Sequence, residues 1–311
     1  MRIINKFFRL VLVLFMISII SFFLANISSI DSAETIGHHL YGNPSQEQIE
    51  NIRIEKGLDK PAHIQYIKWL QHALVGDLGI SYQTSNPVLS DIKDKLFATV
   101  KLVIVSLFFI AVITIPLSLV SAYKKDTLID KSIQVITILG ISVPSFWLGY
   151  VLLSIFAIKL PIFKVVEYGN FRSLILPAAT LAAPVISSSV KILRTTLLEN
   201  SEQEYVTYAR ARGLSYKRIL YAHILKNSLP PMITLFFQNI GMMIAGSVIV
   251  ENVFSWPGLG AYFMSAIVNR DTPAITGCML ILGMIFVISN YVSESINHFL
   301  NPHIFTIEED N

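Results

Sequence analysis

Six long apolar runs constrain the fold of this chain more than any other feature of its sequence. A helix needs roughly 20 apolar residues to cross a hydrocarbon core about 30 Å thick, and all six runs approach or exceed that length. Only 14% of the residues are charged, against about 25% in an average soluble domain, so a soluble fold would lack residues for its surface. We therefore predict an all-α membrane protein with six transmembrane helices. The runs cover residues 10–27, 96–122, 133–158, 174–193, 232–250 and 275–296.

The first run has two interpretations, a cleaved signal peptide or a permanent anchor. Arg2, Lys6 and Arg9 precede it, as basic residues precede a signal core. Its apolar stretch of about 18 residues exceeds the roughly 7–15 of a typical signal core, and no clear A-x-A-like cleavage site follows. We predict that residues 1–30 form an uncleaved transmembrane helix.

Basic residues indicate the orientation. They gather before the first run, after the second run and between residues 191 and 226, and a six-span topology places all three segments on one side. The positive-inside rule makes that side cytoplasmic. Both termini, including a tail over residues 301–311, are therefore predicted in the cytoplasm, and residues 31–95 are predicted to be extracytoplasmic.

The segment 31–95 is too patterned to be a plain connector. The residues from Ser45 onward are typical of a helix start, and residues 62–74 have helical apolar spacing. Gly76 and Gly79 flank an Asp-Leu pair and predict a turn. The segment precedes a membrane-spanning domain that we place at residues 96–300.

Catalytic and nucleotide-binding signatures are absent from the sequence. It contains no G-x-x-x-x-G-K-[ST], H-E-x-x-H or G-x-S-x-G motif. The single cysteine, Cys278, excludes a disulfide framework. His38 and His39 are adjacent but lack a third ligand at helical spacing, which predicts a solvated loop and no metal site. We predict a protein that is not an enzyme, needs no cofactor and binds no nucleic acid, so any energy-driven work requires a subunit that binds the nucleotide.

Charged residues within the runs lie near their ends. Lys101, Glu251 and Glu294 follow this pattern, and no Asp–Arg or His–Glu pair falls at the middle of a run. Proton-coupled transporters mark their pathways with such buried charges, so their absence argues against that class. Glu251 is predicted either to line a pathway or to anchor the helix at the membrane interface.

The loop over residues 197–228 carries the most information. Ser201 and Glu204 predict a capping box, and Tyr205, Tyr208, Ala209 and Arg212 recur at the spacing of one helix face. Gly213 is predicted to end that helix in a left-handed conformation.

A second helix is predicted to begin at Ser215 and to end at Asn227, Pro230 and Pro231. One of its faces carries Ile219, Leu220, His223 and Ile224. Two short amphipathic helices in a basic loop favour docking into a partner's groove, although a pair lying on the membrane surface remains an alternative.

A second cluster runs from Glu251 to Gly260 and combines aromatic residues with a Pro-Gly turn. Trp256 is predicted either to close over a pathway or to belong to an aromatic belt at the interface. Prolines within or beside the runs predict kinks in a packed bundle. They are Pro116, Pro144, Pro177, Pro184, Pro230 and Pro231.

At these residues the sequence resembles the permeases of binding-protein-dependent ABC importers, in the dipeptide, oligopeptide and nickel branch. The stretches from Glu204 to Leu214 and from His223 to Pro230 are similar to that family's coupling loop. The resemblance extends over nearly the whole chain, through the segments 57–61, 76–81, 140–144, 251–260 and 269–271.

The resemblance implies a set of partners: a second related permease, two cytoplasmic ATPases and an extracellular binding protein of the lipoprotein type, with lipid around the bundle. It implies that the helix of about residues 201–212 couples to an ATPase and that substrate passes near the third and fifth spans. The implied coupling residues are Glu204, Tyr205, Tyr208, Ala209, Arg210, Arg212 and Gly213, and the pathway candidates are Ser142, Pro144, Asn239, Glu251 and Trp256.

Two departures from the family pattern concern single residues. The common Glu-Ala-Ala before the glycine reads Thr207-Tyr208-Ala209, and the usual Asp-Pro-Arg near the C-terminus reads Asn301-Pro302-His303. The amino-acid sequences of segments 251–258 and 265–271 are slightly closer to those of nickel permeases. A nickel, cobalt or other metal chelate is therefore the first predicted substrate, and a peptide is the second. A stand-alone secondary transporter and a membrane enzyme are weaker alternatives, because neither broken charged helices nor a nucleophile–base pair is found.

Overall fold

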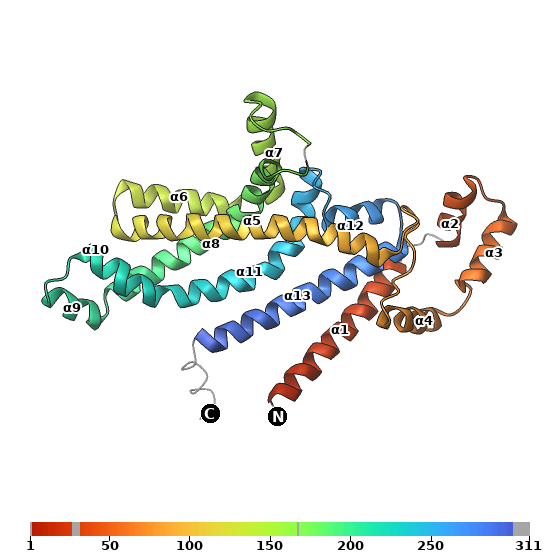
Figure 1. Ribbon diagram of the computed structural model, residues 1–311, viewed down its shortest axis with the longest axis horizontal. Coiled ribbons are helices and arrows are strands. Elements are labelled where there is room, and N and C mark those ends of the chain that lie inside the picture. The colour runs from red at the N-terminus through yellow and green to blue at the C-terminus, as the bar shows by residue number, and fades with distance from the viewer. Residues whose placement is uncertain (1, 27–31, 167, 301–311) are drawn as a thin grey trace. The chain divides into compact units, whose positions relative to one another are not determined.

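Helices form all the regular secondary structure in residues 2–26, 32–166 and 168–300, the part of the chain that the computed structural model describes (Figure 1). The chain divides into two compact units, and each is described by itself. The first comprises Met1–Val100 and Trp256–Val287, and the second comprises Lys101–Ser255 and Ile288–Asn311. Two predicted features, the end of the first run at Ile27 and the tail with Asn301-Pro302-His303, lie outside the described residues.

The first unit contains two predicted helices and one predicted turn of the segment 31–95, and all three are confirmed. The Ser45 hydroxyl accepts a bond from the Gln48 N–H, while the Gln48 side chain accepts one from the Ser45 N–H, which closes a capping box at the start of α3. Gly76 and Gly79 have φ of +85° and +87° in the turn after α4. The helices are α1 (Arg2–Asn26), α2 (Ser32–Tyr41), α3 (Gln46–Lys56), α4 (Ala62–Leu74), the start of α5 (Val88–Tyr123), α12 (Leu259–Val268) and the start of α13 (Thr272–Leu300).

The second unit is built on long apolar helices. The remainder of α5 and of α13 belongs to it, and α8 and α11 pack against each other along their lengths. Besides these parts, the unit contains α6 (Leu128–Ser142), α7 (Ser145–Leu153), the π-helix η1 (Ser154–Lys159), α8 (Phe171–Ser201), α9 (Glu204–Ala211), α10 (Tyr216–Ile219), the π-helix η2 (Leu220–Ile224) and α11 (Leu225–Val253).

Four described helices are long and apolar enough to cross a membrane. They are α5, α8, the continuous helix Tyr216–Val253 and the described part of α13, and they contain the second, fourth, fifth and sixth predicted runs. α1 is apolar over Phe8–Leu24, the part whose side chains are described. The all-α membrane fold is therefore confirmed, while the number of six spans stays a prediction.

The third predicted run does not form one straight helix. α6 and the α7–η1 helix meet at an angle of 106°, with the break at Val143 and Pro144. Val143 is extended (φ −81°, ψ 125°), as a residue before proline prefers, and Pro144 has no N–H to continue the helical ladder. The run over residues 133–158 therefore forms two helices joined by a sharp bend at Pro144, where a kink was predicted, and its crossing of the membrane stays a prediction.

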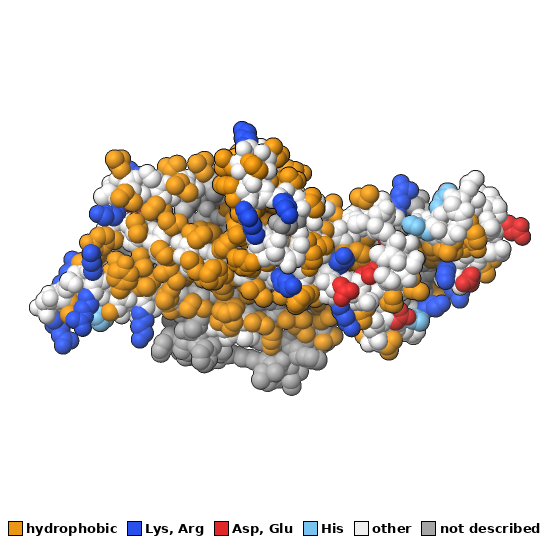
Figure 2. Space-filling view, turned by 45° about the horizontal axis from the view of Figure 1, so that its top comes forward, with side chains coloured by type: hydrophobic (Ala, Val, Ile, Leu, Met, Phe, Trp, Pro, Cys, Tyr) orange, Lys and Arg blue, Asp and Glu red, His pale blue; other side chains and the backbone are white. Residues whose placement is uncertain are grey.

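Hydrophobic side chains cover most of the visible surface of the molecule, and Lys and Arg gather where α9 and α10 lie (Figure 2). Exposed apolar residues include Ile104, Phe108 and Val112 of α5 and Val135 and Ile136 of α6. Contiguous apolar surface of this extent is unfavourable in water and favourable in lipid, so these faces match a membrane environment.

Two buried carboxylates hold the loop 80–87 against helices of the first unit. Asp271 caps α13 by accepting a bond from the Ala274 N–H (3.2 Å), and it also accepts bonds from the Ser81 hydroxyl (2.5 Å) and the Gln83 N–H (3.2 Å). Nearby, Asp91 accepts bonds from Thr84, Asn86 and Tyr262, at 2.5, 3.2 and 3.2 Å. Segments 76–81 and 269–271, both singled out in the sequence, therefore meet at one carboxylate.

The substitution Asp271→Ala should lower the free energy of unfolding by about 2–4 kcal/mol, because it removes a helix cap and leaves buried donors without an acceptor. Denaturant unfolding in mild detergent measures the loss. Asp94→Ala, at an exposed carboxylate of α5, should change the value by less than about 0.5 kcal/mol. Equal losses in the two variants would contradict the role assigned to Asp271.

Candidate functional site

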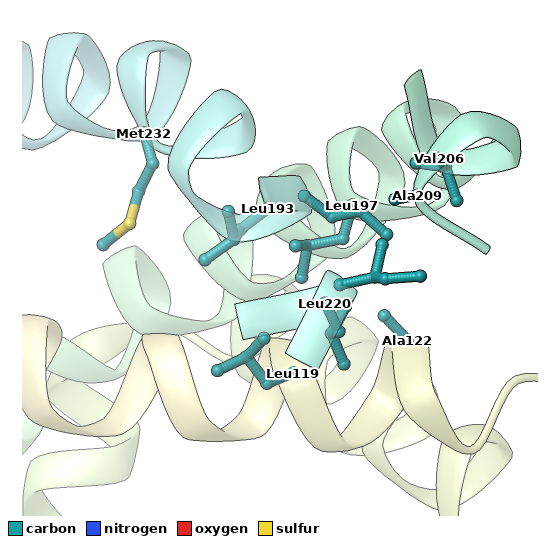
Figure 3. Close-up of a cluster of buried hydrophobic side chains, with 10 residues drawn as sticks. Leu119, Ala122, Leu193, Leu197, Val206, Ala209, Leu220 and Met232 are labelled. Atoms are coloured by element: carbon teal, nitrogen blue, oxygen red, sulfur yellow. The ribbon is translucent and has the colours of Figure 1, made fainter. Parts of the chain in front are cut away.

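The most distinctive surface of the second unit is the segment between α8 and α11, which contains α9. α9 has only eight residues, too few for a stable isolated helix, so its position depends on packing. Val206 and Ala209 point into a buried cluster with residues from α5, α8, α10, η2 and α11 (Figure 3). The cluster consists of Leu119, Ala122, Leu193, Leu197, Val206, Ala209, Ile219, Leu220, Ile224 and Met232.

The two faces of α9 differ from the predicted ones. Val206 and Ala209 form the inner face with half-buried Tyr205, whose hydroxyl lies 3.5 Å from Asn200 Oδ1. Tyr208, predicted on the same face, is 67% exposed, and Arg212 is also exposed. The predicted face therefore differs from the observed one, because the prediction left out Val206, which is buried.

The outer face of α9 presents polar and aromatic groups to the surroundings. Its exposed residues are Glu204, Thr207, Tyr208, Arg210 and Ala211, and the C-cap residue Arg212 is exposed as well. The Arg210 guanidinium lies 5.3 Å from the ring centroid of Tyr216, and Tyr216 stacks on Tyr123 of α5 at 5.9 Å. These contacts extend the surface beyond the helix itself and attach it to α5.

α9 ends as predicted and begins differently. Gly213 has φ +79°, its N–H donates to the Arg210 carbonyl (2.9 Å), and the Leu214 N–H donates to Ala209 (3.3 Å). This pair of bonds is the Schellman motif that glycine favours. The predicted capping box is wrong: Ser201 is the last residue of α8, and its hydroxyl donates to the Leu198 carbonyl (2.6 Å).

The second predicted helix of the loop does not stop at Pro230 and Pro231. It continues through η2 into α11, so Tyr216–Val253 is one helical segment of 38 residues. Ile219, Leu220 and Ile224 are buried as predicted, but His223 is exposed. The wider turn of the π-helix shifts the register and turns His223 outward.

Polar side chains fasten the loop's base. Asn200 Nδ2 lies 3.0 Å from the carbonyl of Thr196 and 3.0 Å from the hydroxyl of Ser228. The Ser228 hydroxyl is buried between carbonyls of α8 and η2, at 3.3 Å from Thr196 and 2.9 Å from Ile224. The end of α8 and the start of α11 are thus joined directly beside α9.

A buried ion pair lies in the same unit and was not predicted. Asp130, the fully buried carboxylate of α6, accepts bonds from Arg194 Nε (2.8 Å) and Nη2 (2.7 Å) of α8 and from Ser121 of α5 (2.5 Å). The Asp126 N–H adds a bond at 3.0 Å. The sequence gives no local signal for this pair, because the two residues are 64 positions apart.

Four of the predicted pathway residues lie in the second unit, two at the break between α6 and α7 and two on α11. Ser142 and Pro144 are exposed at the break between α6 and α7. Asn239 is half-buried on α11 and donates to the Leu235 carbonyl (2.8 Å). Glu251, on the last turn of α11, is fully buried and lies 3.1 Å from the Ser247 hydroxyl.

α7 lies close to the Glu251 end of α11. A Cβ added at Gly149 would lie 3.0 Å from a Val253 methyl carbon and 3.2 Å from the Phe254 ring. The absence of a side chain at this position therefore permits the contact between α7 and the helix that carries Glu251.

Trp256, the fifth pathway candidate, is 2% exposed in the first unit. Its indole N–H donates to the Ala98 carbonyl of α5 (3.1 Å), and the Leu259 N–H donates to the Thr99 hydroxyl (2.8 Å). In this arrangement Trp256 holds the turn before α12 against α5.

Comparison with known proteins assigns the chain. The sequence profile described as "Binding-protein-dependent transport system inner membrane component" matches residues 114–306, and the corresponding N-terminal profile matches residues 1–103. The chain belongs to this family. It is an ABC importer permease of the peptide and nickel branch, and it is an integral membrane protein.

Individual relatives agree with the family. A putative peptide transport system permease of Brucella abortus is 33% identical over 300 residues, which cover 94% of this chain and 95% of the relative. A metal-staphylopine import permease of Staphylococcus aureus is 31% identical over 290 residues, or 93% of each chain. A structure of the MetNI methionine ABC transporter has a similar fold, with a TM-score of 0.56 and 17% identity over 67% of this chain and 95% of that one.

Removing one partner of the Asp130–Arg194 pair should cost far more stability than removing both charges. Arg194→Met leaves an uncompensated buried carboxylate and should lower the free energy of unfolding by about 3–5 kcal/mol. The double variant Asp130→Asn/Arg194→Met should recover roughly half of that loss. Denaturant unfolding in detergent gives both values. Lys191→Met, at an exposed position of α8, is the matched control. A double variant less stable than Arg194→Met would show that the unpaired charge of Asp130 is not the cause of the loss.

Proposed function

We propose that this permease subunit receives the force of ATP hydrolysis through α9. The observation that carries the proposal is the division of α9 into two faces, with Val206 and Ala209 fixed in a core and Tyr208 and Arg212 exposed. A short amphipathic helix with its apolar face already buried has only its outer face free for a partner. This division also argues against α9 lying flat in the membrane surface, which requires an exposed apolar face.

The packing around α9 supports a route for transmitting force. Its inner face shares one buried cluster with α5, α8 and η2, and η2 continues without a break into α11. Closely packed cores transmit displacement because they contain few voids. A shift of α9 would therefore move the start of α11, the helix that carries Asn239 and Glu251.

The proposed complex contains two cytoplasmic ATPases on the α9 side, a second permease and an extracellular binding protein of the lipoprotein type. Family membership supports the ATPases and the binding protein. In this arrangement α1 crosses a bacterial cytoplasmic membrane, both termini are cytoplasmic, and residues 31–95 are extracytoplasmic. The basic residues near α9 support this orientation.

The substrate path is proposed to run past the bend between α6 and α7 and the Glu251 end of α11. The exposed Ser142 and Pro144 line a helix break of 106°. Broken helices supply backbone groups to transport sites within membranes. Trp256 is assigned a fastening role instead, because its indole is buried and bonded to Ala98.

Peptides are the first proposed substrate and a metal chelate the second. The relative with 33% identity is named a putative peptide permease, whereas the metal-staphylopine permease is 31% identical. The amino-acid sequences of segments 251–258 and 265–271 favoured the metal chelate, and the metal-staphylopine relative keeps it as the second candidate. A chelate travels as a small organic complex, so it requires no cluster of histidines in the permease.

Exposed residues of α9 should be dispensable for folding and required for coupling. Tyr208→Ser and Arg212→Glu should each reduce ATPase co-purification and substrate-dependent uptake about tenfold or more, as expected for central contacts of an interface. Thermal unfolding of both variants should match that of the parent. Tyr41→Ser and Lys93→Glu change the same residue classes at exposed positions of α2 and α5 and should leave uptake unchanged. Normal uptake by both α9 variants would refute the coupling assignment.

The substrate class can be decided with the complete complex reconstituted in lipid with its binding protein. ATP hydrolysis is measured after addition of short peptides or, separately, of chelated nickel or cobalt. We expect several-fold stimulation by peptides and none by the chelates. Stimulation by the chelate alone would reverse the order of the two candidates, and stimulation by neither would reject both.

A further inference from the structure

The first unit contains a cavity of about 550 Å³ that the transport function leaves unused. One face of α4 lines it with Ile64, Lys68 and Trp69, while Lys60 lies at the α4 start and Phe22 enters from α1. Most of the surface that lines it is apolar. A cavity of this kind fits a ligand with an apolar body.

The rim of the cavity has an excess of positive charge. Lys60 and Lys68 are exposed, and neither forms an ion pair within the part of the chain that the structure describes. The lining carboxylate, Asp77, accepts bonds from the Gly79 N–H (2.9 Å) and lies 2.9 Å from His72 Nδ1. The Gly79 bond, with that of His72, holds the pKa of Asp77 below its usual value, so the carboxylate is already compensated. The lysines therefore favour an anionic ligand.

Aromatic packing joins α4, which lines the cavity, to α1. The Phe22 ring lies 5.5 Å from that of Tyr66 and 5.6 Å from that of Trp69. Ser18 of α1 lies 2.9 Å from the Tyr66 hydroxyl. Ile20, two residues before Phe22, is 52% exposed, so α1 keeps apolar surface on its side away from the cavity. Aromatic residues beside apolar helix surface are typical of the headgroup level of a bilayer.

We propose that this cavity binds an anionic phospholipid, with its phosphate between Lys60 and Lys68 and its apolar part against Phe22, Ile64 and Trp69. Clusters of basic residues next to membrane helices select anionic headgroups. An acidic segment of another protein would also meet the lysines, but it would not account for the apolar walls that adjoin α1. The inference rests on the proposed crossing of the membrane by α1, and it is tested by binding, independently of transport.

The test uses the complete complex in mild detergent with dioctanoyl phosphatidylglycerol as the probe and dioctanoyl phosphatidylcholine as the neutral comparison. Native mass spectrometry measures saturable binding. Lys60→Gln/Lys68→Gln should weaken phosphatidylglycerol binding about thirty-fold, because each basic residue at an anionic surface contributes roughly five-fold. Lys93→Gln/Lys159→Gln removes two exposed lysines outside the cavity and should leave binding unchanged.

Three results would overturn the proposal. The first is equal binding of the two lipids, and the second is an equal effect of the two double variants. The third is a Lys60→Gln/Lys68→Gln variant that binds lipid normally but has a weaker affinity for the binding protein. The last result would assign the lysines to a protein contact instead.

A second measurement needs no lysine variant. In vesicles, brominated phosphatidylglycerol should quench tryptophan fluorescence more than brominated phosphatidylcholine at the same mole fraction. Trp69→Phe should abolish the excess, while exposed Trp147, 52% accessible, contributes equally with both lipids. Equal quenching by both lipids in the parent complex would also overturn the proposal.

Discussion

A bilayer removes water from the backbone, and this constraint governs the whole fold. Each N–H and C=O within the hydrocarbon must find a partner in the chain, which long helices provide. The chain keeps its helices continuous even where α8 contains Pro177 and Pro184 and α11 contains Pro230 and Pro231. Hydroxyl groups beside these positions bond to backbone carbonyls, as Thr180 does to Leu176 and Thr234 to Pro230.

Under the same constraint, two buried carboxylates lie where several donors converge. Asp130 in the second unit and Asp271 in the first each collect bonds from more than one element. Both carboxylates lie at helix beginnings, where they satisfy backbone N–H groups as well as side chains. Helix ends are thereby fixed by specific polar bonds, while the helix surfaces between them stay apolar and suited to lipid.

Local patterns in the sequence predicted local structure well. The spacing of apolar residues over 62–74 and the glycine at Gly213 were sufficient, because a helix face and a left-handed turn depend on neighbours in sequence. Contacts between distant segments were not predictable in this way. Nothing near Ser201 shows that α8 extends to it, and nothing near Asp130 identifies Arg194 as its partner. The bend at Pro144 was expected as a kink, but its size depends on the surrounding packing.

The candidate site illustrates why the phase of α9 could not be derived from its own eight residues. Its sequence allows either Tyr208 or Val206 to face inward, since each begins an apolar stripe with Ala209 nearby. The choice depends on packing against the buried cluster, to which Leu119, Leu197 and Leu220 contribute from three other elements. Val206 and Ala209 fit into that cluster, whereas a tyrosine would overpack it. The packing of α9 against its own subunit therefore determines which side chains remain exposed to a partner.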